Sequence, residues 1–172
     1  MTGVDASVPG EVIRERLVRW EDPLAALKQA AGMSRDELLA AFASDDFPEP
    51  PIASMLDFHV VEVDAGRAVL ALHLAEFHCN SMGIVAAGVT ATVLDAAMWI
   101  AVQAGAPEGT LVNTVSFNMH LLRQLPPTLD VVRVEAQAIH IGRSTSAAEG
   151  RLVDEAGKVY AHATSGLVAL GG

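Results

Sequence analysis

The stretch AAGVTATVLDAAMWIAV, residues 86–102, decides the fold expected for this 172-residue chain. Apart from one carboxylate, at Asp95, it contains only Ala, Val, Leu, Ile, Met, Trp, Gly and Thr, and no other charged side chain. A helix that is apolar nearly all round must be covered on most sides by other elements. We therefore predict a central, buried helix over residues 86–102.

Asp95 is an unexpected residue in such a helix. It is the only Asp, Glu, Lys or Arg between Glu76 and Glu108. A carboxylate in apolar surroundings loses hydration that nothing in the neighbouring sequence replaces. Ionisable groups kept at that cost are concentrated in functional sites. Asp95 is therefore the first candidate catalytic residue; the alternative is a structural carboxylate that bonds backbone, Asn or Thr groups.

The sequence on both sides of this helix has the pattern of β-strands. Two strands are predicted before it, over residues 56–64 and 68–74. Four more are predicted after it, over residues 111–122, 129–141, 145–154 and 158–170, with Pro- and Gly-containing turns between them. This order indicates an α+β fold in which an antiparallel sheet wraps around the helix. The long apolar strands also favour a partner subunit that covers part of the sheet.

Residues 1–52 have a different pattern and are predicted to form a helical extension, followed by the main domain at residues 53–172. The first helix is predicted from apolar residues at helical spacing, namely Val12, Ile13, Leu17 and Trp20. The Pro-rich segment 47–51 cannot continue a helix and is predicted to be the linker.

Two further helices of the extension are predicted from their end signals. Asp22 followed by Pro23 is typical of an N-cap and a first-turn proline, and Gly32 is typical of the residue that ends such a helix. Ser34 and Glu37 form a capping box, which predicts a third helix over residues 38–42.

The composition of the whole chain excludes several classes of protein. The net charge is −10 with eleven Lys and Arg, which disfavours nucleic-acid binding. No uninterrupted apolar stretch reaches the roughly 18 residues of a membrane span. The N-terminus has no apolar signal segment. The single cysteine, Cys79, fits a reducing compartment, so we expect a cytoplasmic protein.

The loop and helix together resemble a known signature. Asn80-x-x-Gly83-x-x-Ala86-Ala87-Gly88, followed by Leu94-Asp95-x-Ala97, resembles N-x-x-G-x-x-H-G-G…L-D-x-A. This pattern is that of hotdog-fold acyl-CoA thioesterases of the phenylacetate-degradation (PaaI) type, within the 4-hydroxybenzoyl-CoA thioesterase-like superfamily. Further similarities are Pro50-Pro51-Ile52-Ala53, Asn113-Thr114, Leu121-Leu122-Arg123, His140-Ile141-Gly142-Arg143 and Tyr160-Ala161-His162-Ala163-Thr164. The resemblance covers about residues 50–170.

The resemblance implies a hotdog fold and hydrolysis of a thioester between an acyl group and coenzyme A. By position, Asp95 would activate water or attack the thioester carbonyl itself. The backbone N–H of Ala87 would polarise the carbonyl oxygen, with Asn80 assisting. Thr114 matches a hydroxyl residue that helps to hold the water.

The resemblance also implies the substrate-binding residues and the assembly. Met82, Gly83 and Gly88 would line the substrate site. Arg123 and Arg143 are candidates for contacts to the phosphates of coenzyme A, although solvated charges at strand ends are common. The enzyme would need no metal or redox cofactor. Related enzymes build each site across a dimer interface, so a homodimer or a homotetramer is expected.

Elementary chemistry supports this assignment independently. A thioester carbonyl gains negative charge as water adds, and free N–H groups at a helix start stabilise that charge. Asp95 lies about 12 Å beyond Ala87 along a helix axis. That distance is too long for both to serve one carbonyl within one chain, so a second, antiparallel chain is expected to supply its own Asp95.

One departure from the signature keeps two other functions open. The His-Gly pair of the family is Ala86-Ala87 here, which preserves the N–H but adds a methyl group and removes a polar side chain. A hotdog protein that binds acyl-CoA without turnover is one alternative. A hotdog dehydratase or hydratase is the other, and the lack of a histidine at position 86 disfavours it. No His/Cys metal spacing and no G-x-S-x-G motif occur in the chain.

Overall fold

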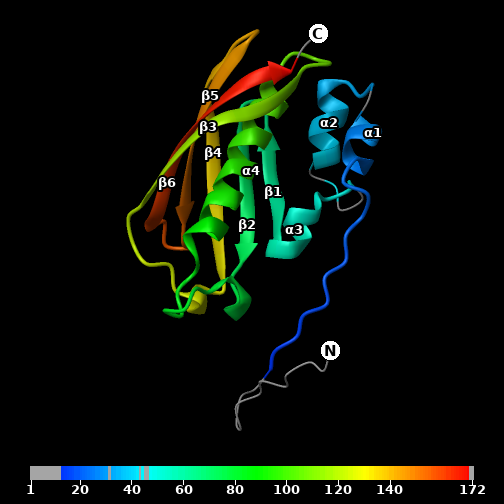
Figure 1. The fold of residues 1–172 in the computed structure, drawn as a ribbon. Coiled ribbons are helices and arrows are strands. Elements are labelled where there is room, and N and C mark those ends of the chain that lie inside the picture. Colours follow the sequence, from blue (N-terminus) through cyan, green and yellow to red (C-terminus); the bar gives the residue numbers. More distant parts are fainter. Residues whose placement is uncertain (1–12, 31, 43, 45–46, 171–172) are drawn as a thin grey trace, which may run out of the picture.

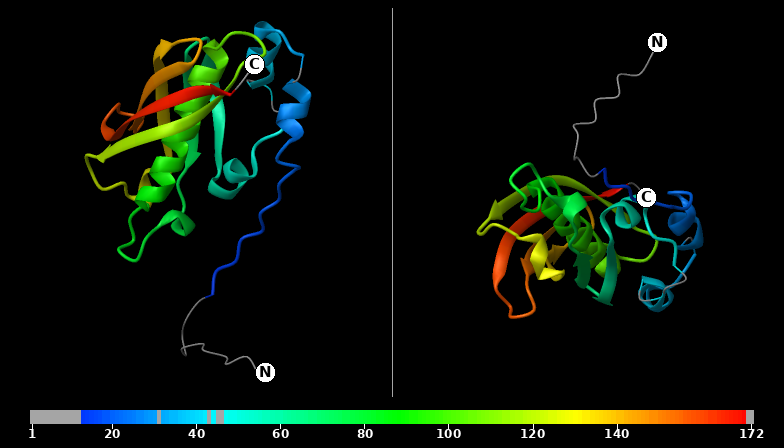
Figure 2. Two further views of the ribbon diagram at one scale, coloured as in Figure 1. Left: turned by 45° about the horizontal axis from the view of Figure 1, so that its top comes forward. Right: turned by 90° about the horizontal axis from the view of Figure 1, so that it is seen from below.

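The computed structural model describes residues 13–30, 32–42, 44 and 47–170. In this part of the chain, six strands form one antiparallel sheet in the order β1-β2-β4-β5-β6-β3. The strands are β1 Phe58–Asp64, β2 Arg67–His73, β3 Leu111–Leu121, β4 Val131–Ile141, β5 Thr145–Val153 and β6 Val159–Leu170. The sheet curves around the long helix α4, Ala87–Gly105 (Figures 1 and 2). This confirms the predicted α+β arrangement.

Helix α4 packs into the concave side of the sheet. Its sheet-facing residues are fully buried and recur at helical spacing: Val93, Leu94, Ala97, Met98 and Ala101. Gly150 on β5 allows the close approach, because a Cβ atom there would lie 3.2 Å from Leu94 Cδ2 and 3.3 Å from Met98 Cγ. Of the described helices, only α4 is long and apolar enough to cross a membrane, and here it is the core helix.

The helix runs past the predicted end at Val102 to Gly105 because its last turn is tied to β3. The side chain of Gln103 donates to the Thr110 carbonyl at 2.8 Å and accepts the Val112 N–H at 3.1 Å. Gly105 packs closely as well, since a Cβ atom there would lie 2.9 Å from the backbone nitrogen of Gly66. These contacts join residues that local sequence patterns do not relate.

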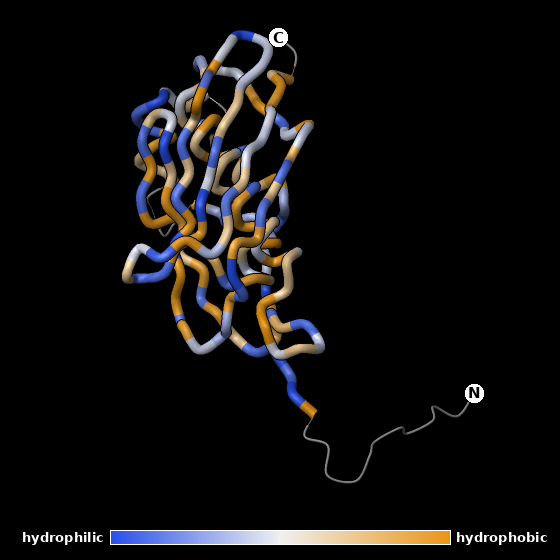
Figure 3. The backbone as a smooth tube through the Cα atoms, turned by 90° about the vertical axis from the view of Figure 1, so that its left-hand side faces the viewer, coloured by the Kyte–Doolittle hydropathy of each residue, from blue (hydrophilic) through white to orange (hydrophobic). Residues whose placement is uncertain are grey.

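The sheet has one apolar and one polar face. Along β4 and β5 the buried residues alternate with exposed ones, and Figure 3 shows the corresponding alternation of hydrophobic and hydrophilic positions along neighbouring strands. The outer face carries ion pairs, for example Arg151 with Glu135 at 2.8 Å and Arg67 with Glu62 at 2.8 Å. The core therefore lies between α4 and the inner face.

The helical extension consists of α1 Ala25–Ala30 and α2 Arg35–Phe42, and a short α3, Pro51–Leu56, precedes β1. The predicted capping box is present: Glu37 Oε2 accepts the Ser34 N–H at 2.8 Å, and Ser34 Oγ accepts the Glu37 N–H at 3.4 Å. Asp22 Oδ1 accepts the Leu24 N–H at 2.9 Å, and Gly32 has φ +88°. The predicted capping residues are thus confirmed, although α2 begins at Arg35, before the predicted first residue Leu38.

The prediction of a helix from Val12 to Trp20 is wrong for the described residues, 13–20. This segment has no helix and follows an extended path along the body of the protein (Figure 1). Arg16 holds it there. Its guanidinium donates to the carbonyls of Met55 at 2.7 Å and Ser54 at 3.1 Å, and its Cζ lies 3.9 Å from the centre of the Phe77 ring. Isolated helices this short are marginal in water, so these contacts decide the conformation. Val12 lies outside the described residues.

The linker prediction also needs a correction at its end. Residues 47–50 are not helical, but Pro51 starts α3 with proline at the first position of the helix, where no N–H is required. The helix α3 crosses the predicted boundary between residues 52 and 53, and that boundary stays a prediction.

Candidate active site

The loop between β2 and α4 carries Asn80 in a tight turn. Asn80 Oδ1 accepts the Met82 N–H at 2.9 Å, and the Asn80 carbonyl accepts the Gly83 N–H at 3.0 Å. Gly83 has φ +73°, a left-handed conformation that favours glycine. The Asn80 side chain thus closes its own turn through its oxygen. In the described part of the chain, its amide NH2 group has no acceptor and can donate to a ligand.

His78 fixes this loop to the body of the protein, a role that sequence patterns did not predict. The imidazole is 1% exposed. Its Nε2 lies 2.9 Å from the Leu56 carbonyl and donates to it, and its Nδ1 accepts the Ala75 N–H at 3.1 Å. The His78 carbonyl accepts the Ala86 N–H at 2.9 Å. His78 therefore connects the end of α3 with the start of α4.

His78 should make the stability of the protein fall in mild acid. Burial is the largest cause that lowers the pKa of His78, and protonation of Nδ1 would remove the acceptor of the Ala75 N–H. The unfolded chain then binds the proton more readily than the folded one, so this stability is present above about pH 6.5 and is lost as the pH falls towards the folded-state pKa. Urea unfolding at pH 7.5 and 5.5 should show the loss in wild type. An equal loss in His78→Gln would contradict this role.

The first turn of α4 offers unbonded N–H groups. The helix starts after Ala86, which makes no side-chain cap, and the first intrahelical bond runs from the Val89 N–H to the Ala86 carbonyl at 3.0 Å. Among the described residues, no acceptor contacts the N–H of Ala87 or Gly88, and both residues are exposed. A Cβ atom at Gly88 would meet nothing within 4 Å. This end of α4 can accept a polarised carbonyl oxygen.

Asp95 lies in the middle of α4 on the side that faces β3. Trp99, one turn further along the same side, donates its indole N–H to the Val112 carbonyl at 2.8 Å. The chain direction of β3 then carries Thr114 towards the level of Asp95. Asp95 Oδ1 is buried and has no hydrogen-bond partner among the described residues. The alternative role, a structural carboxylate that bonds nearby groups, is disfavoured by this lack of partners.

Buried polar atoms without partners recur in this region. Within the described chain there are four: Asp95 Oδ1, Thr114 Oγ1, Ser165 Oγ and Arg35 Nε. Three of these belong to α4, β3 and β6, and Arg35 belongs to α2. Leaving one such group unsatisfied costs about 1–3 kcal/mol, and native structures contain few. Ser165 was not among the predicted residues, because a serine in a strand carries no signal of its own.

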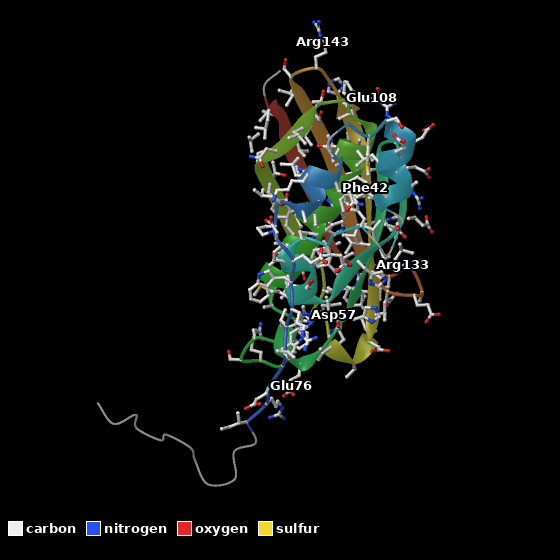
Figure 4. All side chains as sticks on the ribbon, turned by 90° about the vertical axis from the view of Figure 1, so that its right-hand side faces the viewer. Phe42, Asp57, Glu76, Glu108, Arg133 and Arg143 are labelled. Carbon is white, nitrogen blue, oxygen red and sulfur yellow. The ribbon has the colours of Figure 1, made fainter. Side chains whose placement is uncertain are left out.

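Of the two predicted phosphate contacts, Arg143 lies apart from the loop. The Arg123 guanidinium donates to the Val159 carbonyl, and its backbone N–H donates to the Tyr160 carbonyl at 3.2 Å. Arg143 is exposed in the β4–β5 turn, at the opposite end of the molecule from Glu76 and the Asn80 loop (Figure 4). One chain therefore brings together Asn80, Ala87 and Gly88, but not Arg143. Its role stays a prediction.

The residues near the site do not form a metal centre. Across the described ranges, no three His, Cys, Asp or Glu side chains come together as metal ligands. The groups that can act chemically are the carboxylate of Asp95, two hydroxyls and the free backbone N–H groups.

Comparison with known proteins shows a similarity to one protein family. Residues 82–161 match the family described as the thioesterase superfamily. The domain has the hotdog fold of that superfamily. No curated protein matches the sequence. The resemblance predicted from the Asn80–Asp95 spacing is thereby confirmed for the fold and the superfamily.

Solved structures of other hotdog proteins are similar to this chain. A thioesterase family protein from Silicibacter pomeroyi is 25% identical, with a TM-score of 0.70 over 78% of this chain and 99% of that one. The E. coli PaaI protein from the phenylacetic acid degradation operon is 18% identical, with a TM-score of 0.66 over 87% and 96%. A hypothetical thioesterase protein with coenzyme A from Streptococcus pneumoniae TIGR4 is 19% identical, with a TM-score of 0.59 over 66% and 86%.

Proposed function

We propose that the protein hydrolyses an acyl-CoA or aryl-CoA thioester to the free acid and coenzyme A. The single observation that carries the proposal is Asp95, a partly buried carboxylate without a partner on the central helix of a hotdog domain. The match of residues 82–161 to the thioesterase superfamily supports it. The Streptococcus pneumoniae protein with coenzyme A supports the choice of thiol.

The proposed reaction needs two sets of groups: N–H donors that bind the thioester oxygen, and a carboxylate that acts as the base. The thioester oxygen accepts the N–H of Ala87 and the side-chain NH2 of Asn80, which stabilises the negative charge that develops there. Asp95 removes a proton from water as the water oxygen bonds to the carbonyl carbon. The tetrahedral intermediate then collapses, the C–S bond breaks, and the thiolate of coenzyme A leaves and takes up the proton. Direct attack by Asp95, through an anhydride that water then hydrolyses, is the second route.

The helix start at Ala87 and the Asp95 carboxylate can reach one carbonyl only if two chains pair. The edge strand β3 is the surface best suited to this pairing. It is the outermost strand beside β6, and its residues 111–121 contain no Asp, Glu, Lys, Arg or Pro. Large apolar side chains are exposed along it: Leu111, Val115, Phe117 and Leu121. An edge this long and unprotected pairs readily with another strand. We propose antiparallel pairing of β3 with β3 of a second copy.

This pairing also accounts for the separation of Ala87 and Asp95. The chain runs up α4 and back along β3, so a two-fold axis through the middle of β3 makes the two helices antiparallel (Figure 1). The start of one helix then lies beside the middle of the other. The site would be complete only in the dimer, and a tetramer would be a pair of such dimers.

A charge in the middle of this edge should separate the subunits. Val115→Lys places an ammonium group at a position that is 61% exposed in the single chain. We expect light scattering after size exclusion to give at least twice the 18.0 kDa chain mass for wild type and a smaller mass for the variant. The rate of thiol release should fall as the fraction of dimer falls. Val61→Lys is the control, because Val61 is 48% exposed on the opposite edge strand, β1. A wild-type monomer with full activity would contradict the shared site.

The test of function is release of free thiol from a panel of acyl- and aryl-CoAs by the purified protein. Apolar acyl chains should be preferred, because Ala, Val, Met and Phe side chains surround the helix and β3. The second candidate, an acyl-CoA-binding protein, is favoured by one specific feature, the Ala86-Ala87 pair. If calorimetry shows tight acyl-CoA binding and the assay shows no thiol release, the protein is an acyl-CoA-binding protein and not a hydrolase.

A further inference from the structure

Ser165 is a buried polar residue that has no role in the reaction described so far. It lies on β6, is 5% exposed, and its Oγ has no hydrogen-bond partner among the described residues. The large majority of buried side-chain polar atoms have a partner, from the protein or from ordered water. A partner from outside the described residues of this chain is therefore expected at Ser165.

The strand register places Ser165 beside the candidate site. Buried residues alternate along β6 at Ala161, Ala163, Ser165 and Leu167, which puts Ser165 on the inner face that packs against α4. Thr114 on β3 pairs with Leu167, and Ser165 pairs with Phe117, with a bulge in β3 between Thr114 and Ser116. Ser165 is thus the diagonal neighbour of Thr114 on that face, at a Cα separation of about 7–8 Å. Thr114 in turn lies on the side of β3 towards which Asp95 faces.

The three groups have complementary hydrogen-bonding capacity. An ionised carboxylate only accepts, whereas each hydroxyl donates one proton and accepts others. A buried water molecule typically makes about three hydrogen bonds. We propose that Asp95, Thr114 and Ser165 of one chain hold a single water molecule, the one that hydrolyses the thioester, and that Ser165 is a positioning residue for it. This inference rests on the proposed thioesterase function.

The arrangement of protons gives Ser165 a defined task. The water donates one hydrogen to Asp95 and the other to Ser165 Oγ, and it accepts the hydroxyl proton of Thr114. Its remaining lone pair points at the carbonyl carbon held at the helix start of the second subunit. Asp95 receives the first proton as the C–O bond forms, and Ser165 gains and loses no covalent bond. Without Ser165, Asp95 can still take a proton from the water, but the water loses one of the three hydrogen bonds that fix its orientation.

The test is Ser165→Ala in the full-length protein, with Ser146→Ala as the matched control. Ser146 is likewise a buried serine, 7% exposed, on the adjacent strand β5, and it has no role in the proposed reaction. We expect Ser165→Ala to lower kcat about ten- to a hundredfold, since misplacement of a reacting group by about 1 Å has an effect of that size. KM should stay unchanged. The melting temperature should stay or rise, because the removed hydroxyl had no partner, whereas a purely structural serine would lower it.

A high-resolution crystal structure of wild type and Ser165→Ala provides a second readout that needs no activity. A water molecule bound to all three side chains in wild type, and lost or displaced in the variant, supports the inference. An unchanged kcat in Ser165→Ala, or a wild-type site without that water, overturns it. Wild type without any thiol release would refute the proposed function, and the crystallographic water would then decide the inference on its own.

Discussion

Asp95→Asn should lower kcat for thioester hydrolysis by about 10²–10⁴-fold, the usual contribution of a positioned general base. The amide has nearly the shape of the carboxylate but cannot take a proton from water at neutral pH, nor attack the carbonyl. Binding of acyl-CoA should persist, because the Ala87 N–H and Asn80 are unchanged. Thiol release at saturating acyl-CoA measures kcat, and calorimetry measures binding.

The fold should tolerate this change well. Asp95 Oδ1 has no hydrogen-bond partner among the described residues, so the variant breaks no internal bond there. The thermal midpoint of Asp95→Asn should equal or exceed that of wild type. Asp64→Asn, at the exposed end of β1, is the matched control and should leave kcat unaltered. An Asp95→Asn enzyme with wild-type kcat would remove Asp95 from the mechanism.

Ala87→Pro should be the second most damaging change, because it deletes the N–H proposed to bind the thioester oxygen. Loss of one such donor costs about 2.7–4 kcal/mol of transition-state stabilisation, or about 10²–10³ in kcat. Proline suits the first position of a helix, where the N–H has no intrahelical partner. Ala86 has φ −65° and ψ 141°, a conformation that also suits the residue before proline. Steady-state thiol release measures the loss.

Ala87→Gly is the matched control for this change. It keeps the N–H, restores the glycine of the family signature and removes the methyl group that narrows access to the helix start. We expect activity equal to or above that of wild type. Circular dichroism should give the same helix content and a similar melting temperature for both variants. If Ala87→Pro hydrolyses acyl-CoA as fast as wild type, the oxyanion is stabilised elsewhere.

Most of the secondary structure could be predicted from the sequence, because its causes are local. The apolar run around Asp95, the alternation in each strand and the Ser34–Glu37 capping box act over a few residues. The observed strands start and end within three residues of the predicted limits. The Asn80-to-Asp95 spacing also identified the superfamily, since it fixes a turn, a helix start and a carboxylate in one continuous segment.

The candidate site was only partly predictable. Asp95, Ala87 and Asn80 lie in one segment, so their relation follows from the helix. Ser165 and His78 acquire their positions from contacts with distant residues, and neither lies in a recognisable pattern. Whether a serine hydroxyl is exposed or buried without a partner depends on which strand pairs beside it.

The sequence by itself thus determined the core helix, the strands, the one carboxylate within that helix and the resemblance to the thioesterase superfamily. Only the tertiary structure decided the path of residues 13–20, the His78 link between α3 and α4, and the burial of the Ser165 hydroxyl on the inner face of the sheet. The physical reason is the sequence separation over which each interaction acts. Periodicity and capping operate within a turn or two, whereas Arg16 reaches the Met55 carbonyl across 39 residues of chain. Contacts of that kind form only when the whole sheet has closed around α4.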